Sequence, residues 1–431
     1  MDDKIKILQI SDIHWQKTLE LADDYKDIQE LMLQDVKYYC LHNKEKFDRI
    51  LICGDIAFSG HKDEYTKAEK FINRLCDILG CKATDVNMIP GNHDRNVDAD
   101  FKTTRELLHE AFDVDKDSDQ KLENLLLSEF ETYKMLNKPF EQYAIFANDT
   151  FDSGESLMYN SLQEDYKKYD RNNDTMYWMS EFDTKLSGYS VYLYGFNTAF
   201  TSDLNDYDAD NEKRKDGHKL FLPKITYNPA SLLDGRINIM MAHHPMGFIH
   251  NGESIQKDLD KKYKLQLYGH VHISNAESNA DAIHIFSGSF EPGAYDTSKY
   301  RPTYNIIELS VIENENKEDL LHVDLQVHYW NGKRFEQDND NSKSMNVKLP
   351  ASSDRFDNSH ISDEQKLPEG VTQRDIRSMF KRCEDYQDII ESLYPGRFDT
   401  STVRYRLNQS FLEQVRIDKR WLDLYNKLEE Q

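Results

Sequence analysis

The sequence lacks the features of a membrane or secreted protein. It contains no apolar run of 18 or more residues, the length at which a membrane-spanning helix becomes a candidate. Its first ten residues, MDDKIKILQI, carry acids where a secretory signal peptide carries positive charge. The five cysteines are odd in number, and a disulfide framework is not expected in a chain of this length. We therefore expect a cytoplasmic protein without a membrane segment.

Basic charge is also in short supply. The chain has 54 Lys and Arg against 78 Asp and Glu, which gives a formal net charge of −24. Broad, sequence-independent binding to nucleic acid depends on Lys and Arg that neutralise phosphates. The charge therefore disfavours such binding, although it leaves room for a local basic groove or for metal ions that face a phosphate. It also gives no reason to expect attraction to an anionic membrane surface.

Strand-like and helical segments alternate through the first hundred residues. The strand-like segments are 4–10, 48–55 and 86–94, and the helical stretches between them end near His42 and run from about Asp63 to Leu79. Such alternation predicts parallel strands joined by right-handed crossovers. Further strand-like segments lie at 189–197, 236–245, 264–272, 282–289, 304–311 and 321–330. The pattern as a whole predicts an α/β fold.

Three other segments depart from this alternation. Residues from about 99 to 185 are acidic and rich in tyrosine, which predicts a helical insertion. Residues 336–370 are polar and predict a linker, so that the main domain spans 1–335. Residues 371–431 predict a C-terminal helical module of two amphipathic helices, at about 372–393 and 401–429. Their apolar stripes predict a packing surface for each other, for the core, for another subunit or for a protein partner.

Polar side chains that can bind metal ions follow five of the predicted strands at their C-terminal ends, where open α/β sheets bind ligands. These residues are Asp12 and His14, Asp55, Asn92 to Asp94, His243 and His244, and His270 and His272. Each cluster is common on its own, as a turn or a surface histidine, but five in this order indicate one shared site. Carboxylate and imidazole ligands suit Mn, Fe or Zn, and a set without thiolates argues against a structural zinc site.

The order of these motifs resembles that of the calcineurin-like metallophosphoesterase superfamily. The matching motifs are Asp12-x-His14, Gly54-Asp55, Gly91-Asn92-His93-Asp94, His243 and Gly269-His270-x-His272. The resemblance covers roughly residues 4–335, and the GDIAFSG stretch looks most like the bacterial phosphodiesterase branch. It implies a four-layer α/β/β/α sandwich with a helical insertion and a C-terminal helical module. It also implies a phosphodiesterase that cleaves a nucleotide or a similarly small phosphodiester.

The resemblance assigns the ligands to two divalent cations, Mn most readily, with Fe, Zn, Ni or Mg as alternatives. The first cation would be held by Asp12, His14, Asp55 and His272. The second would share Asp55 and would also take Asn92, His243 and His270. A hydroxide between the two ions would attack phosphorus in line.

The remaining motif residues receive roles beside the ions. His93 is implied as the group that donates to a phosphoryl oxygen or protonates the leaving group. Asp94 would orient the His93 ring from behind. His244 would support the site or face the substrate. Aromatic side chains of the insertion could cover the site and stack a base, but their loose spacing favours a small apolar core.

Two other functions remain open. In the first, the same chemistry cleaves DNA or RNA, and basic residues of the C-terminal tail grip the strand. Those residues are Arg374, Arg377, Lys381, Arg382, Arg404, Arg406, Arg416, Lys419 and Arg420. In the second, the protein is a non-catalytic scaffold that binds a partner and holds structural metals. The His93-Asp94 pair argues against a scaffold, because a scaffold needs no acid.

Overall fold

The computed structural model describes most of the α/β part of the chain and fragments of its C-terminal tail. The described residues are 4–15, 22–43, 46–96, 98, 118–170, 174–202, 220–228, 235–290, 301–350, 367–368, 371, 376–377, 379–380, 383, 385–398, 411–412, 415 and 420–430. No helix among them is long and apolar enough to cross a membrane.

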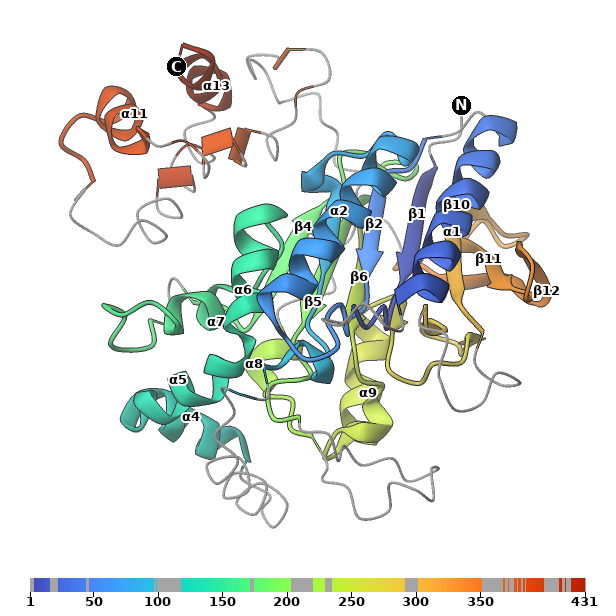
Figure 1. Ribbon diagram of the computed structural model, residues 1–431, viewed down its shortest axis with the longest axis horizontal. Helices are drawn as coiled ribbons and strands as arrows, with labels where there is room; N and C mark the ends of the chain where they lie inside the picture. Colours follow the sequence, from blue (N-terminus) through green and yellow to red (C-terminus); the bar gives the residue numbers. More distant parts are fainter. Residues whose placement is uncertain are drawn as a thin grey trace.

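Two six-stranded sheets form the centre of the molecule (Figure 1). The first has the order β12-β11-β10-β1-β2-β3. Its strands are β1 (Ile5–Ile10), β2 (Arg49–Ile52), β3 (Val86–Met88), β10 (Thr303–Glu313), β11 (Asp319–Trp330) and β12 (Phe335–Lys348). Strands β1, β2 and β3 are parallel, as the sequence predicts, and β10 to β12 extend the sheet by antiparallel pairing.

The second sheet has the order β4-β5-β6-β7-β9-β8. Its strands are β4 (Tyr177–Glu181), β5 (Ser190–Phe196), β6 (Arg236–Ala242), β7 (Leu265–Tyr268), β8 (Asn275–Ser278) and β9 (Ile283–Phe286). The four central strands are parallel, and β4 and β8 pair antiparallel at the two edges.

Helices cover the outer faces of both sheets and complete four layers. Helices α1 (Ala22–Asn43) and α2 (Lys62–Leu79) connect β1 to β2 and β2 to β3. Helix α9 (Gly252–Lys262) packs with the outer face of the second sheet. This arrangement is the α/β four-layer sandwich that the resemblance implies.

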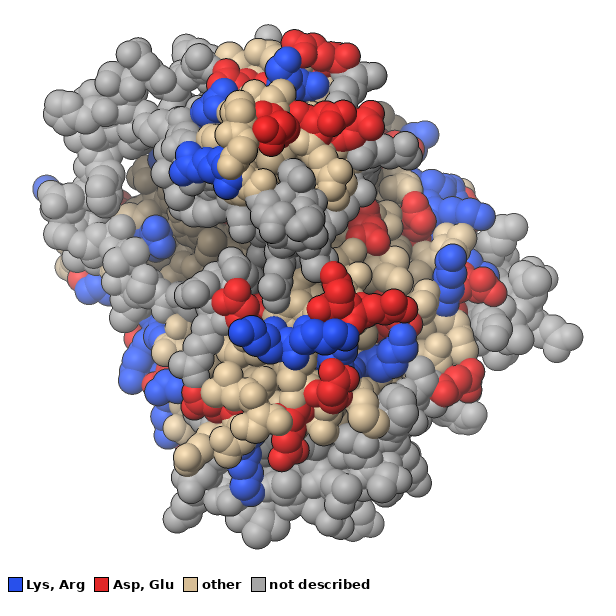
Figure 2. Space-filling model, turned by 90° about the vertical axis from the view of Figure 1, so that its left-hand side faces the viewer, with Lys and Arg blue, Asp and Glu red and all other residues tan. Residues whose placement is uncertain are grey.

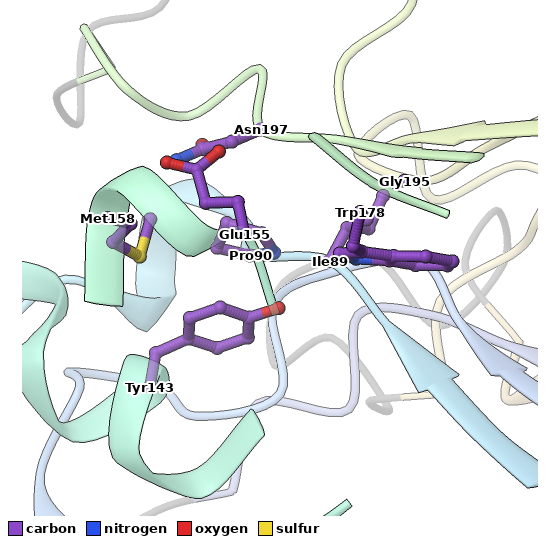
Figure 3. Close-up of a pocket in the computed structure, with 8 residues that line it drawn as sticks. All are labelled: Ile89, Pro90, Tyr143, Glu155, Met158, Trp178, Gly195 and Asn197. Carbon is purple, nitrogen blue, oxygen red and sulfur yellow. The ribbon is translucent and has the colours of Figure 1, made fainter. Parts of the chain in front are cut away.

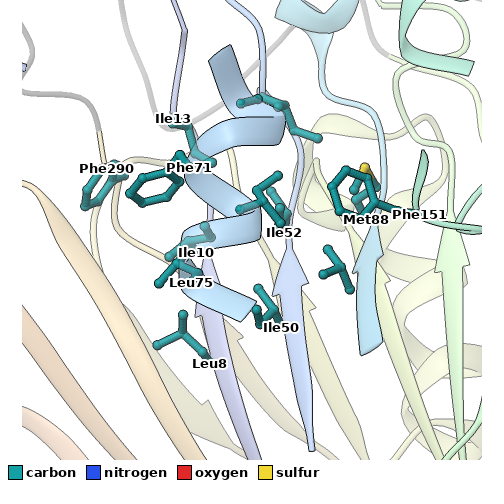
Figure 4. Close-up of a cluster of buried hydrophobic side chains, with 14 of the residues drawn as sticks. Leu8, Ile10, Ile13, Ile50, Ile52, Phe71, Leu75, Met88, Phe151 and Phe290 are labelled. Carbon is teal, nitrogen blue, oxygen red and sulfur yellow. The ribbon is translucent and has the colours of Figure 1, made fainter. Parts of the chain in front are cut away.

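Strand β1 shows how the sequence fits this position between two layers. Ile5 and Ile7 point into the apolar cluster between the two sheets. Leu8 and Ile10 point the other way, into the cluster under the helices (Figure 4). All four side chains are fully buried, and burying each contributes about 1.5–3 kcal/mol. A strand buried on both faces has no polar face, which is why its sequence is a nearly continuous apolar run.

Strand β12 corrects the predicted linker at 336–370. It pairs with β11 from Trp330 to Leu320, so the sheet continues to residue 348. The strand was missed because it is polar: β12 lies at a sheet edge, and much of it is exposed while Met345 and Val347 reach the core. Residues 351–366 of the predicted linker lie outside the described residues.

The insertion is mostly helical, as predicted, over its described part. Its helices are α4 (Ser118–Ser128), α5 (Phe130–Asn137), α6 (Glu141–Ile145) and α7 (Ser156–Ser161). Aromatic side chains such as Tyr133 and Tyr143 are buried in apolar clusters, so they serve as core. The predicted boundary at 185 is wrong, because β4 already belongs to the second sheet. Residues 99–117 lie outside the described part.

The C-terminal tail has an apolar cluster of its own. Helices α11 (Tyr386–Leu393) and α13 (Trp421–Glu429) contribute to it, and its described members all come from residues 367–428. In Figure 1 these helices lie apart from the two sheets. Of the nine basic residues in the nuclease hypothesis, only Arg377 and Arg420 fall within the described residues; Arg377 lies over the Trp421 ring, and Arg420 pairs with Asp423.

Candidate metal centre

The candidate ligands follow five parallel strands at their C-terminal ends. Asp12 and His14 follow β1, Asp55 follows β2, Asn92 follows β3, His243 follows β6, and His270 and His272 follow β7. Because both sheets end their central strands on the same side, these loops meet over one edge of the sandwich. The structure therefore brings together every residue that the sequence assigns to the two cations.

One group of ligands surrounds Asp12. Its Oδ1 atom lies 3.0 Å from Nε2 of His272 and 3.9 Å from Nε2 of His14. Asp12 and His14 are buried, whereas the His272 side chain is 34% exposed. One carboxylate and two imidazoles thus converge on a point near the surface.

A second group surrounds His243. Its Nε2 atom lies 3.2 Å from Oδ1 of Asn92 and 3.3 Å from Nδ1 of His270. His243 is fully buried, and its Nδ1 lies 2.8 Å from the carbonyl oxygen of Cys53. A carbonyl oxygen only accepts, so Nδ1 carries a proton, and Nε2 is the nitrogen that faces the other ligands and could bind a cation in place of its own proton.

Asp55 lies between the two groups. Its Oδ2 atom is 3.6 Å from Nε2 of His14 and 3.4 Å from Nε2 of His243. Its Oδ1 atom accepts a hydrogen bond of 2.8 Å from the main-chain N–H of His93. One carboxylate therefore faces both ligand groups, which is the placement that a bridging ligand requires.

The donor set fits divalent cations. In the described chain, the ion pairs of Asp12 and Asp55 involve histidines and no Lys or Arg. Oδ1 of Asp12 is buried and accepts no hydrogen bond of good geometry. Two buried carboxylates that face imidazoles and no Lys or Arg favour a cation that compensates their charge. Carboxylate, amide and imidazole donors are the ligands that Mn, Fe and Zn accept.

The backbone of the ligands is held in an uncommon conformation. Nine non-glycine residues of the described chain have positive φ, and five of them are candidate ligands: Asp12, His14, Asp55, His270 and His272, with φ between 50° and 69°. Such a conformation costs on the order of 1–3 kcal/mol per residue and persists only where the surroundings impose it. Here main-chain bonds impose it: the N–H of His14 donates to the carbonyl of Asp55, and that of His270 donates to Oδ2 of Asp12.

Three motif glycines leave the space that the ligands occupy. A Cβ at Gly91 would lie 2.1 Å from Oδ1 of Asp55, and one at Gly54 would lie 2.4 Å from Nδ1 of His243. A Cβ at Gly269 would lie 2.3 Å from Oγ of Ser11. No real side chain tolerates such contacts, so each glycine is needed for the close approach of two loops.

Comparison with known proteins matches this centre to a family. A model of the calcineurin-like phosphoesterases matches residues 5–274, which include every candidate ligand. The chain belongs to the calcineurin-like phosphoesterase family. This confirms the resemblance read from the motifs, and the protein is a metal-dependent phosphoesterase.

Individual relatives are distant. The uncharacterized metallophosphoesterase-like protein YydB of Bacillus subtilis (strain 168) is 24% identical over 387 residues, which are 84% of this chain and 70% of that protein. Among solved structures, a predicted phosphoesterase of Streptococcus pneumoniae TIGR4 is 9% identical, with 80% of this chain and 98% of that chain covered and a TM-score of 0.29. Vacuolar protein sorting 29 of Cryptosporidium parvum is 10% identical, with 80% and 99% covered and a TM-score of 0.31.

Two buried histidines of the phosphoesterase centre have pKa values that are shifted in opposite directions. Burial lowers the pKa of His14 to about 3, so this imidazole is neutral and able to bind a metal. Burial also acts to lower the pKa of His243, but the neighbouring Asp55 and Asp12 carboxylates raise it to about 10. The pKa of Asp55 lies well below its usual value despite burial, because His243, His93 and His14 stabilise the carboxylate.

His93 stands beside the ligands at the open side of the centre. It is half-buried, and its ring centroid lies 4.6 Å from that of His14. Its Nδ1 lies 2.9 Å from the carbonyl oxygen of Phe58. Since a carbonyl only accepts, Nδ1 carries a proton, and Nε2 is the nitrogen that can exchange one with a substrate.

Asp94 does not take the role that the resemblance implies. In the described structure none of its hydrogen bonds reaches the His93 ring; the carboxylate accepts from the main-chain N–H groups of Ile56, Ala57 and Gly91 and from the hydroxyl of Tyr65. Asp94 is fully buried under the turn. Burial and the nearby Asp55 raise its pKa to about 7 against the effect of these bonds. It therefore fixes the loop after β2 to the loop after β3, and the Phe58 carbonyl orients His93.

Two groups that contact histidines of the centre could hardly be predicted from the sequence. The carbonyl of Phe58 belongs to the main chain, which no residue pattern reveals. Thr198 follows β5 and lies 3.0 Å, through Oγ1, from Nδ1 of His244. His244 is buried, with its ring centroid 4.4 Å from that of His270, and it belongs to a group of three histidines whose ring nitrogens could hold an ion. The position of Thr198 at a strand end was the one available hint.

A small cavity lies behind the loop after β3 (Figure 3). It is lined by Ile89, Pro90, Tyr143, Glu155, Met158, Trp178, Gly195 and Asn197. The Glu155 carboxylate comes from the insertion and faces Asn197 at the end of β5 (Figure 3). Burial raises the pKa of Glu155 to about 8. The cavity thus places a buried acid of the insertion next to the loops that follow β3 and β5.

Proposed function

We propose that this phosphoesterase hydrolyses phosphodiesters of nucleotide or similarly small size, with two divalent cations of which Mn is the first choice. The observation that carries the proposal is the place of Asp55, whose Oδ2 atom lies 3.6 Å from one ligand group and 3.4 Å from the other. A shared carboxylate supports two ions, and two ions suit the displacement of an alkoxide or aryloxide from phosphorus.

His93 and Asp94 would have different roles in the reaction at phosphorus. When bound, the cations would activate a water and neutralise charge on the phosphoryl oxygens. His93 would hold a proton at Nε2 for the leaving oxygen, with its ring fixed through Nδ1 by the Phe58 carbonyl. Asp94 would hold the loop after β2 against the loop after β3, because its carboxylate accepts hydrogen bonds from the N–H groups of Ala57 and Gly91.

Surface charge supports a small substrate over a long polyanion. On the face shown in Figure 2, described Lys and Arg side chains lie interleaved with Asp and Glu. Such a mixture does not provide the continuous positive field that grips a nucleic-acid backbone. Together with the net charge of −24, this favours a short substrate held mainly by the metal centre.

The test is a substrate panel on the Mn-loaded protein. Bis-p-nitrophenyl phosphate, cyclic nucleotides, and single- and double-stranded DNA would be assayed beside His93→Ala. We expect turnover of small diesters and a loss of about 100-fold or more in His93→Ala. Cleavage of DNA but of no small diester would replace the proposal with the nuclease, and metal binding without activity on any substrate would favour the scaffold.

A further inference from the structure

Phe58 presents an exposed aromatic ring at the metal centre. The residue is 42% exposed, and its ring centroid lies 5.5 Å from that of His93 and 6.1 Å from that of His14. A single exposed apolar side chain is ordinary elsewhere on a protein surface. This ring, however, lies next to His93, the residue proposed above to protonate the leaving group.

The loop that carries Phe58 is held firmly on both sides. The N–H of Phe58 donates to the carbonyl of Trp15 at 3.0 Å, and its carbonyl oxygen lies 2.9 Å from Nδ1 of His93. The next residue, Ser59, donates from both its N–H and its hydroxyl to the fully buried carboxylate of Glu64. The ring therefore stands on a fixed main chain, and little ordering is left for a ligand to impose on that main chain.

The position of the Phe58 ring beside His93 suggests that it contacts the leaving-group side of a substrate. Since Nδ1 of His93 is taken by the Phe58 carbonyl, a proton can reach the substrate only from Nε2 of that ring. If His93 is the proton donor of the proposed function, the leaving oxygen lies beside His93. The exposed Phe58 ring, 5.5 Å from the His93 ring, is then next to the group attached to that oxygen. Flat apolar groups pack on an aromatic face in offset or edge-to-face geometry.

We infer that Phe58 forms an apolar subsite for an aromatic or heteroaromatic ring on the leaving-group side of the phosphoester. The inference rests on the proposed function and narrows its substrate class to diesters with an aryl or nucleoside leaving group. Phe58 would supply affinity for the ring, while the metal centre supplies affinity for the phosphoryl group.

The experiment measures binding, so that it does not depend on turnover. Phenylphosphonate and methylphosphonate would be titrated calorimetrically into the Mn-loaded full chain, as wild type, Phe58→Ala, Phe58→Tyr and Leu127→Ala. Leu127 is a matched control, because it is 56% exposed on helix α4. The two probes differ only in the ring.

We expect the wild type to bind phenylphosphonate about tenfold more tightly than methylphosphonate. Phe58→Ala should weaken phenylphosphonate about five- to tenfold and leave methylphosphonate within about twofold. Phe58→Tyr and Leu127→Ala should keep the preference. Equal binding of the two probes by the wild type, or a preference that survives in Phe58→Ala, overturns the subsite alone. Failure of both probes to bind overturns the proposed function and the subsite with it.

Discussion

Asp55 is the residue whose removal should disturb the centre most, because one of its carboxylate oxygens lies between the two ligand groups. We expect Asp55→Ala to lose both cations after dialysis and nearly all turnover. Metal content per chain by mass spectrometry checks this, with Asp77→Ala on the exposed side of helix α2 as the control. A variant with two tightly held metals per chain would show that Asp55 is not the shared ligand.

Gly91 tests whether the close approach of two loops is needed for metal binding. A methyl group there would meet Oδ1 and the main-chain N of Asp55, at 2.1 Å and 2.5 Å. Gly91→Ala should therefore displace Asp55 and weaken metal binding by about tenfold or more, since misplaced ligands lose affinity steeply. Gly247→Ala is the matched control, because a Cβ there meets no atom within 4 Å. Equal metal affinity of the two variants in a competition titration would contradict the steric account.

At this scale the sequence predicts chemistry better than it predicts contacts. Asp12, Asp55 and His270 could be named as candidate ligands because their residue types suit a metal and because each follows a predicted strand. The role of Asp94 could not, because it depends on three main-chain N–H groups that only the folded turn brings together. The orienting partner of His93 is itself a main-chain oxygen.

Among the elements, β12 offers the clearest test of the fold. Val347 is 2% exposed in the cluster between the sheets, while the neighbouring Lys348 side chain is 58% exposed. Val347→Ala should lower the free energy of unfolding by about 1–3 kcal/mol through the cavity it leaves. Lys348→Ala should change it by less than about 1 kcal/mol, because its partner Glu318 forms an exposed ion pair with it. If urea unfolding shows no difference between the two variants, residues 336–348 would be better described as the linker that the sequence predicts.

Strand β12 also shows which kind of strand cannot be predicted from the sequence pattern. Strands β1, β2 and β3 could be predicted, since strands buried on both faces are apolar runs. Strand β12 is an edge strand with polar residues along most of its length, and its pairing with β11 is set by tertiary contacts. Strand β4 was predicted as part of the helical insertion for a similar reason. It lies at an edge of the second sheet, and its residues are only partly buried.

The stability of the whole molecule should depend on pH through Glu155. Burial raises the pKa of this carboxyl from 4.5 to about 8, so between these values the folded state keeps a proton that the unfolded state has released. The folded state then binds more protons, and the free energy of unfolding falls as pH rises through this range.

Glu155→Gln removes that titration. Between pH 5 and pH 8 the wild type should lose on the order of 3 kcal/mol more stability than the variant. Urea unfolding at the two pH values measures the difference, and parallel pH profiles for the two proteins would contradict it. Because Glu155 lines a cavity between the insertion and the loops that follow β3 and β5, the effect concerns the assembled molecule and not one helix.

The positive φ angles of the five candidate ligands have a consequence for metal binding. In two of them, His14 and His270, the main-chain N–H groups bond to Asp55 and Asp12 on neighbouring loops. The shape of the ligand cage is therefore part of the protein's own hydrogen bonding. A substitution that breaks one of these bonds should disturb several ligands at once, even where it removes none of them.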